Sequence, residues 1–140
     1  MLIVDTSAMI AILLGEPEAS ALSECISSAD ECLISAANYI ELGTVLAGRS
    51  IVDPDQVSRD VDHILDVADI QIAPITEALA RSALKARIRY DKEFKSPAGL
   101  NFGDCFAYAL AKSHDAPLLF IGNDFSKTDI QPALILSEME

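Results

Sequence analysis

Short apolar runs alternate with longer segments of helical periodicity along this chain of 140 residues. The apolar runs are three or four residues long and contain β-branched residues, which is typical of buried strands. Pro132 is compatible with the first position of an edge strand. The predicted strands are 2–4, 32–34, 70–73 and 118–121, with a last edge strand at 132–136.

The segments between these runs carry recognisable helix start and stop residues. Thr6 or Ser7, Ser35 and Thr76 are suited to cap helices, and Gly15 and Gly48 to end them. Alternating short strands and helices indicate an α/β layer fold with a mostly parallel sheet in a single domain over residues 1–140. The predicted helices are 8–15, 17–27, 36–47, 53–68, 76–90 and 105–113, with a loop at 92–99.

Composition restricts the class of protein. Apolar residues make up 51% of the chain and mean hydropathy is +0.29, so a folded core is expected rather than disorder. No run approaches the length of a membrane span, and the N-terminus lacks the pattern of a signal peptide. Three cysteines without metal-binding spacing, Cys25, Cys32 and Cys105, indicate thiols in a reducing cytoplasm. The net charge of −12 argues against adhesion to nucleic acid through the overall field.

Four acidic residues are predicted to meet at one edge of the sheet. Asp5 and Asp124 follow predicted strands, and ligands of open parallel sheets bind beyond the carboxyl ends of strands. Asp104 stands at the start of a helix, which reaches the same edge, and Glu41 interrupts an otherwise apolar or neutral helix. Carboxylates that share a cleft repel one another unless a cation is present, so a Mg²⁺ or Mn²⁺ site is a candidate.

Each acid also has an ordinary structural interpretation. Asp5 and Asp104 are suited to cap the helices that they precede, and Asp124 follows Gly-Asn in a typical turn. Glu41 on a solvated helix face would need no function. Spacing alone leaves both interpretations open for every one of the four.

Four segments that contain these acids resemble motifs of PIN-domain ribonucleases, and in particular of VapC-type toxins. The first two are LIVDTSA at 2–8 and YIEL at 39–42. The third is LNFGDCFAYALAK at 100–112, and the fourth is LLFIGNDF at 118–125 with TDI at 128–130. The resemblance runs in order over nearly the whole chain, and its third and fourth motifs are the specific ones.

The resemblance implies a PIN-like three-layer α/β/α sandwich and Mg²⁺- or Mn²⁺-dependent hydrolysis of RNA. It implies a metal and catalytic site of Asp5, Glu41, Asp104 and Asp124, of which the last can act through water. It further implies a toxin–antitoxin pair with a VapB-like antitoxin, and commonly a homodimer. The positions expected to orient carboxylates or waters are Thr6, Ser7, Asn123, Thr128 and Asp129.

Two other functions remain as alternatives. A PIN-like scaffold without catalysis would only bind RNA or a partner. A receiver-like signalling domain would also bind Mg²⁺ in an acidic α/β pocket, but it needs a lysine at the end of a late strand. Here that strand ends in Gly122-Asn123-Asp124, and Lys112 falls inside a predicted helix.

One segment runs against the acidic average. Residues 81–95 hold six of the ten Lys and Arg residues against two acids, a net of +4. Arg81, Lys85 and Arg89 recur every four residues and so share a helix face, which makes them candidate RNA contacts. An antitoxin carboxylate could use the same bases, and an ordinary solvated helix face would look the same.

Overall fold

The computed structural model describes residues 1–134, and its centre is a parallel four-stranded sheet of order β3-β2-β1-β4. The central strand β1 pairs with both neighbours through Ile3, which lies opposite Leu33 on one side and Leu118 on the other. All three strand pairs are parallel, as the alternation of strands and helices predicts. The strands are β1 (Leu2–Val4), β2 (Cys32–Ser35), β3 (Ile70–Ala73) and β4 (Leu118–Leu119).

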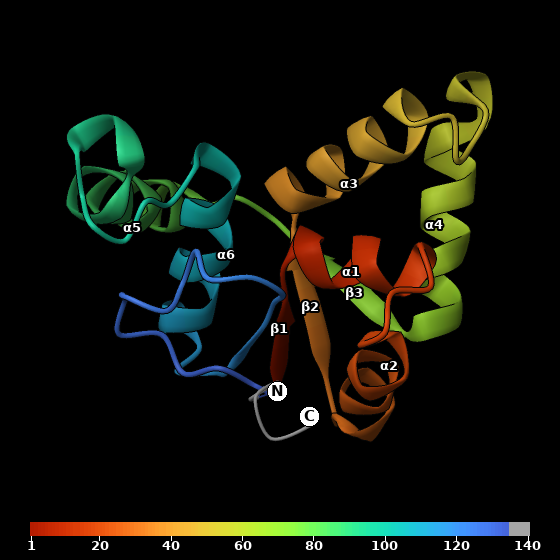
Figure 1. The fold of residues 1–140 in the computed structure, drawn as a ribbon, viewed down its shortest axis with the longest axis horizontal. Helices are drawn as coiled ribbons and strands as arrows, with labels where there is room; N and C mark the ends of the chain where they lie inside the picture. Colours follow the sequence, from red (N-terminus) through yellow and green to blue (C-terminus); the bar gives the residue numbers. More distant parts are fainter. Residues whose placement is uncertain (135–140) are drawn as a thin grey trace.

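Helices cover both faces of the sheet (Figure 1). The first four helices lie on one side of the strands and the last two on the other, which gives the three layers expected from the sequence. The helices are α1 (Thr6–Leu13), α2 (Ala19–Ser28), α3 (Ala36–Gly48), α4 (Val57–Ala68), α5 (Glu77–Tyr90) and α6 (Phe102–Ser113), with short 3₁₀ turns η1 (Pro54–Gln56) and η2 (Lys92–Phe94).

The strands are apolar on both faces because each face packs against helices. Leu2 and Val4 belong to the core beneath α1 to α4, whereas Ile3 between them belongs to the core beneath α5 and α6. In the same way Leu119 packs on the first side and Leu118 on the second. Continuous apolar runs of this kind are the signature of a parallel sheet that is buried on both faces.

Two strand predictions need correction. Strand β4 ends at Leu119 instead of residue 121, because its partner β1 ends at Val4 and leaves the next residues nothing to pair with. The amide of Ile121 donates instead to Ser7 Oγ at 3.0 Å. Of the predicted edge strand at 132–136, a single parallel bridge joins Pro132 to Leu118, and residues 135–136 lie outside the described part.

Helix starts differ from prediction by a few residues where acids take part in capping. Helix α1 is capped by Asp5 rather than by Thr6 or Ser7. Helix α6 begins at Phe102, three residues earlier than predicted, because Asn101 is its cap. Ser35 and Thr76 cap α3 and α5 as predicted. Within residues 1–134 there is no helix with the length and hydrophobicity to cross a lipid bilayer.

Candidate functional site

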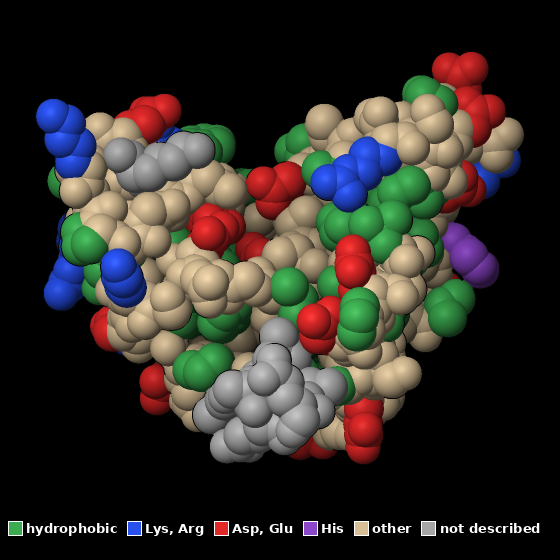
Figure 2. All heavy atoms as spheres, viewed as in Figure 1, with side chains coloured by type: hydrophobic (Ala, Val, Ile, Leu, Met, Phe, Trp, Pro, Cys, Tyr) green, Lys and Arg blue, Asp and Glu red, His purple; other side chains and the backbone are tan. Residues whose placement is uncertain are grey.

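Acidic side chains gather in a hollow between the two helical layers, at the carboxyl edge of the sheet. Figure 2 shows this hollow between the part of the surface formed by α5 and α6 and the part formed by α3 and α4. Asp5 follows β1 directly, and Asp104 lies in the first turn of α6. Both side chains are buried, at 3% and 5% exposure, which is unusual for carboxylates without a cationic partner.

Asp5 joins the ends of two strands through Ser7. Its Oδ2 accepts hydrogen bonds from the amide of Ser7 at 3.1 Å and from Ser7 Oγ at 2.6 Å. The same Ser7 Oγ accepts from the amide of Ile121, just beyond β4. The other oxygen, Asp5 Oδ1, is buried and has no hydrogen-bond partner in the described part of the chain, residues 1–134. A buried acceptor that the fold leaves unsatisfied is costly and therefore points to a missing partner.

Asp104 is held by a reciprocal cap with Asn101. Its amide donates to Asn101 Oδ1 at 2.9 Å, and its own Oδ2 accepts from the amide of Asn101 at 3.1 Å. Asp5 and Asp104 therefore both have the capping role that the ordinary interpretation gave them. Capping fixes the orientation of each carboxylate and uses only its Oδ2 oxygen as an acceptor. It is therefore compatible with a second role for the other oxygen.

The two buried carboxyls are both harder to ionise than free aspartate. Burial raises the pKa of Asp5 to about 6, with further contributions from the charges of Glu41 and Asp124. Burial also raises the pKa of Asp104 to about 8, with further contributions from the charges of Asp5 and Asp124. The charges of Glu41 and Asp124 thus act on Asp5, those of Asp5 and Asp124 act on Asp104, and a cation among these acids would relieve the repulsion.

Glu41 reaches this group through space that Gly103 leaves open. A Cβ atom at Gly103 would clash with Glu41 Oε2, so any other residue there would displace the carboxylate. Asn38 Nδ2 donates to the carbonyl of Gly103 at 3.1 Å and lies 3.4 Å from Glu41 Oε1. Ser35 Oγ in turn donates to Asn38 Oδ1 at 2.6 Å.

Three residues of this arrangement escaped the sequence interpretation: Asn38, Asn101 and Gly103. Asn38 and Glu41 are three apart and therefore neighbours on one helix face, which is a usable signal. Asn101 stands three residues before Asp104, a weak form of the capping-box pattern. The close approach of Gly103 to Glu41 joins residues 62 positions apart, and no local pattern reports it.

The other predicted supporting residues have different surroundings. Ser7 contacts Asp5 directly, whereas Thr6 Oγ1 donates to the carbonyl of Asn38 at 3.3 Å. Thr128 Oγ1 donates within its own turn, to the carbonyl of Phe125 at 2.7 Å. The Asp129 carboxylate accepts from the Tyr108 hydroxyl and pairs with Lys112 Nζ at 3.1 Å.

Asn123 contributes its carbonyl, which accepts from the amide and Oγ of Ser126. Orientation of carboxylates by Asn123, Thr128 and Asp129 therefore stays a prediction, because within residues 1–134 their hydrogen bonds and ion pairs go to other groups than the four acids.

The basic face of α5 points away from the sheet. The buried side of α5 consists of Leu79, Ala83, Ala86 and Tyr90, and helical geometry places Arg81, Lys85 and Arg89 on the outer side. In Figure 2, Lys and Arg side chains lie along the outer margin of this part of the surface, beyond the acidic hollow. Arg81 is paired with Glu77 at 2.6 Å. RNA contact by these three residues stays a prediction.

The donors fit a hard divalent cation by their chemistry. All four are carboxylates, one buried oxygen has no partner, and mutual repulsion contributes to the raised pKa values of Asp5 and Asp104. Over residues 1–134, however, no three His, Cys, Asp or Glu side chains already stand in an arrangement able to hold a metal ion.

Comparison with known proteins gives consistent results over almost the full chain. The PIN domain family matches residues 2–131. The chain is 45% identical to Ribonuclease VapC28 of Mycobacterium tuberculosis over 133 residues, which cover 95% of this chain and 98% of that protein. It is 38% identical to a Ribonuclease VapC of Mycolicibacterium smegmatis, over 92% of this chain and 97% of that one.

The fold is also found in solved structures of low sequence identity. The VapC20 structure from Mycobacterium tuberculosis, described as a sarcin–ricin loop cleaving toxin, superposes with a TM-score of 0.71 at 18% identity. The match covers 93% of this chain and 96% of that one. A toxin–antitoxin complex from Klebsiella pneumoniae gives a TM-score of 0.64 at 20% identity, over 92% and 93% of the two chains.

Proposed function

The chain belongs to the PIN-domain family, among the VapC ribonucleases, and we propose that it is a toxin endoribonuclease whose centre is the hollow around Asp5 and Asp104. The observation that carries this assignment is the pair of buried carboxyls with raised pKa values, one of which has an oxygen without a partner. Ribonucleases of this family generally depend on divalent metals. We propose Mg²⁺ or Mn²⁺ as the ion, because both prefer oxygen ligands.

Asp5, Glu41, Asp104 and Asp124 are the residues that would hold the ion. When bound, a divalent ion supplies an activated water and charge stabilisation for in-line displacement at a phosphodiester. The contribution of the chain is orientation. Ser7 fixes one oxygen of Asp5, Asn101 fixes one of Asp104, and Gly103 leaves room for Glu41.

Partners follow from the same family assignment. We propose RNA as the substrate and a VapB-like antitoxin as the neutralising protein, since two solved neighbours are described as a toxin–antitoxin complex and as VapBC2 bound to promoter DNA. The cytoplasm is the compartment in which such a toxin would meet RNA. A homodimer is a further expectation from the family, and co-purification with a small protein encoded next to it would test the antitoxin.

Cleavage of RNA by the purified protein tests the proposal. We expect cleavage with Mg²⁺ or Mn²⁺ and none after chelation. Asp104→Asn should lower the rate by more than about 100-fold, because loss of a residue that contacts the ion should exceed the 10- to 100-fold effect typical of supporting residues. The matched control is Asp66→Asn, which removes the same charge from an exposed site on α4.

Equal activity of the Asp104→Asn and Asp66→Asn proteins would contradict the site assignment. Intact RNA after incubation with Mn²⁺, despite measurable binding of the ion, would favour the alternative of a catalytically silent RNA- or partner-binding module. Mapping 5′ ends in cellular RNA shortly after induction, with the Asp104→Asn protein as reference, would identify the RNA that is cut.

A further inference from the structure

Two large apolar side chains line the hollow that leads to the acidic site, and both are exposed. Phe102 is the first residue of α6 and is 61% exposed, and Ile40 of α3 is 66% exposed. They border a hollow of about 400 Å³. Glu41 and Gly103 line the same hollow, so the apolar surface is continuous with the predicted metal site.

The Phe102 ring is braced although most of it faces solvent. The guanidinium carbon of Arg87 lies over the ring, 5.1 Å from its centroid. The Phe106 ring meets it edge-on, with centroids 5.0 Å apart and planes at 80°. Cation–π and edge-to-face contacts each favour one ring orientation, so little side-chain entropy remains to be lost on binding.

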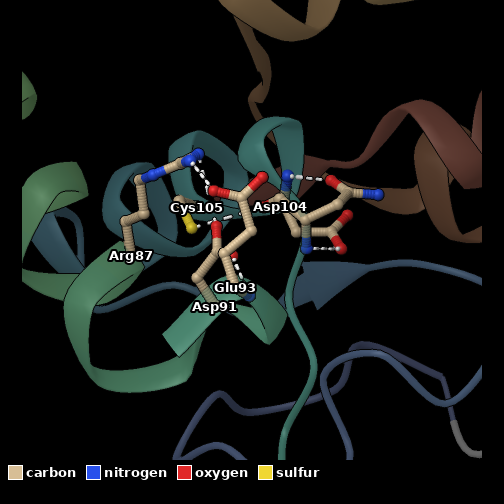
Figure 3. Close-up of polar contacts among 6 residues, drawn as sticks. Arg87, Asp91, Glu93, Asp104 and Cys105 are labelled. Carbon is tan, nitrogen blue, oxygen red and sulfur yellow. Dashed lines mark hydrogen bonds and ion pairs between the residues drawn. The ribbon is translucent and has the colours of Figure 1, made fainter. Parts of the chain in front are cut away.

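Two acidic residues in turn hold Arg87 in place against the Phe102 ring. Arg87 pairs with Asp91 at 3.3 Å and with Glu93 at 2.8 Å, and Figure 3 shows this cluster beside Cys105 and Asp104 at the start of α6. Asp91 is buried, and its Oδ1 accepts from the amide of Glu93 at 2.8 Å. The Phe102 ring thus packs against a guanidinium that is held in place, while most of the ring is exposed to solvent.

Folding gives no reason for this arrangement. A ring that is 61% exposed contributes little hydrophobic stabilisation. A braced aromatic ring beside a phosphodiester-cleaving site is instead what an unstacked base requires. Bases of single-stranded RNA stack on aromatic side chains, and the contact tolerates any base.

We propose that Phe102, with Ile40 on the other wall, forms a stacking subsite for one nucleobase next to the scissile phosphate. This subsite rests on the proposed ribonuclease function. The apolar walls receive the base, while the phosphate belongs at the cation among the carboxylates. A hollow of about 400 Å³ offers room for a single base and for part of its sugar. The occupant is single-stranded RNA and not a double helix, whose bases are already stacked.

Substitutions of Phe102 distinguish an effect of aromatic stacking from an effect of side-chain volume. Phe102→Ala should raise KM for a single-stranded RNA by about 5- to 100-fold, the range of losses seen when a base-stacking aromatic is replaced by alanine, with kcat nearly unchanged. Phe102→Leu keeps apolar volume without an aromatic face and should resemble alanine. Phe102→Trp should restore the KM. The matched control is Phe94→Ala, since Phe94 is 55% exposed and does not line this hollow.

A binding measurement makes the subsite testable apart from catalysis. In the Asp104→Asn protein, a set of single-stranded oligoribonucleotides with 2-aminopurine at successive positions should include one that loses fluorescence on binding, and additional Phe102→Ala should abolish that quenching. Absence of cleavage by the wild-type protein would contradict the proposed function and leave this measurement valid. Unchanged KM and quenching in Phe102→Ala would overturn the subsite. So would equal behaviour of Phe102→Leu and wild type, or an effect confined to antitoxin binding.

Discussion

The two buried aspartates Asp91 and Asp5 differ in the charges that surround them. Asp91 is 1% exposed and Asp5 is 3% exposed, so both have given up hydration. Oδ2 of Asp91 also has no hydrogen-bond partner within residues 1–134, but it lies 3.3 Å from Arg87 Nη1, so its charge faces a cation that the chain itself supplies. The charges acting on Asp5 are those of Glu41 and Asp124, which raise its pKa further above the effect of burial.

This difference separates a structural carboxylate from a functional one. A buried charge is tolerated when it is paired, and an unpaired one is a cost that a fold keeps for a reason. The pair at Arg87 holds the loop between α5 and α6 and braces Phe102. Among the residues that the structure describes, the acids around Asp5 form no ion pair with a Lys or Arg, which is the arrangement that an external ion would complete.

The largest expected effect comes from neutralising each aspartate in turn. Asp5→Asn should lower metal affinity and cleavage by more than about 100-fold, while the free energy of unfolding without metal stays constant or rises, because repulsion is relieved. Asp91→Asn should lower the free energy of unfolding by roughly 1 to 3 kcal/mol and leave metal binding intact, because Arg87 loses a charged partner.

Metal titration by calorimetry and chemical denaturation of both proteins measure the two quantities. The comparison fails if the phenotypes are exchanged, or if Asp5→Asn destabilises the metal-free protein as much as Asp91→Asn does.

Gly103 offers a finer test of the acidic side. Gly103→Ala should lower cleavage by about 10- to 100-fold, because the new Cβ would meet Glu41 Oε2 and displace that carboxylate. Gly48→Ala is the matched control, since no atom lies within 4 Å of the Cβ position there. Initial rates on one RNA substrate compare the two. Equal rates would show that the position of Glu41 is not important.

Local patterns predicted the strands, the helices and the parallel sheet because these depend on periodicity, whereas the three layers and the metal-binding role of the acids came from the family resemblance. Apolar runs at 2–4 and 70–73 are strands as predicted, and residues that follow strands and begin helices meet at one edge. The end of β4 could not be predicted, because it depends on where its partner β1 stops.

The basic residues show more clearly what spacing in the sequence could not predict. Spacing placed Arg81, Lys85 and Arg89 together on α5, but a periodicity does not tell which direction its face points. Arg87, which the spacing left out, is the base that contacts Phe102 at the hollow. Its partner Asp91 is four residues away, so the ion pair had a local signal, while the contact with Phe102 joins separate elements.

The pH dependence of the metal-free protein tests the same acids without any substitution. The pKa of Asp104 rises to about 8 and that of Asp5 to about 6, so folding favours their protonated forms. The stabilisation is complete below the ordinary pKa near 4 and is lost as pH rises through 6 and 8. From pH 5 to pH 8 we expect the free energy of unfolding to fall by roughly 5 kcal/mol, most of it from Asp104.

Denaturation at several pH values measures this slope, and Asp104→Asn should flatten it. Saturating Mg²⁺ or Mn²⁺ should also flatten it, because the ion replaces the protons. A metal-free protein that gains stability from pH 5 to pH 8 would contradict the repulsion on which the comparison depends.

We expect the smallest effect from substitution of an exposed ion pair, which serves as a reference for the buried pair of Arg87 and Asp91. Lys112 and Asp129 lie 3.1 Å apart, with side chains 46% and 52% exposed, so water already solvates both charges. Lys112→Gln should change the free energy of unfolding by less than about 1 kcal/mol and the cleavage rate by less than about twofold. Arg87→Gln should cost more, because it leaves the buried Asp91 charge with no compensating cation. If the two substitutions cost the same, burial would not be what distinguishes the paired aspartate from an ordinary surface charge, and the contrast with Asp5 would lose its physical basis.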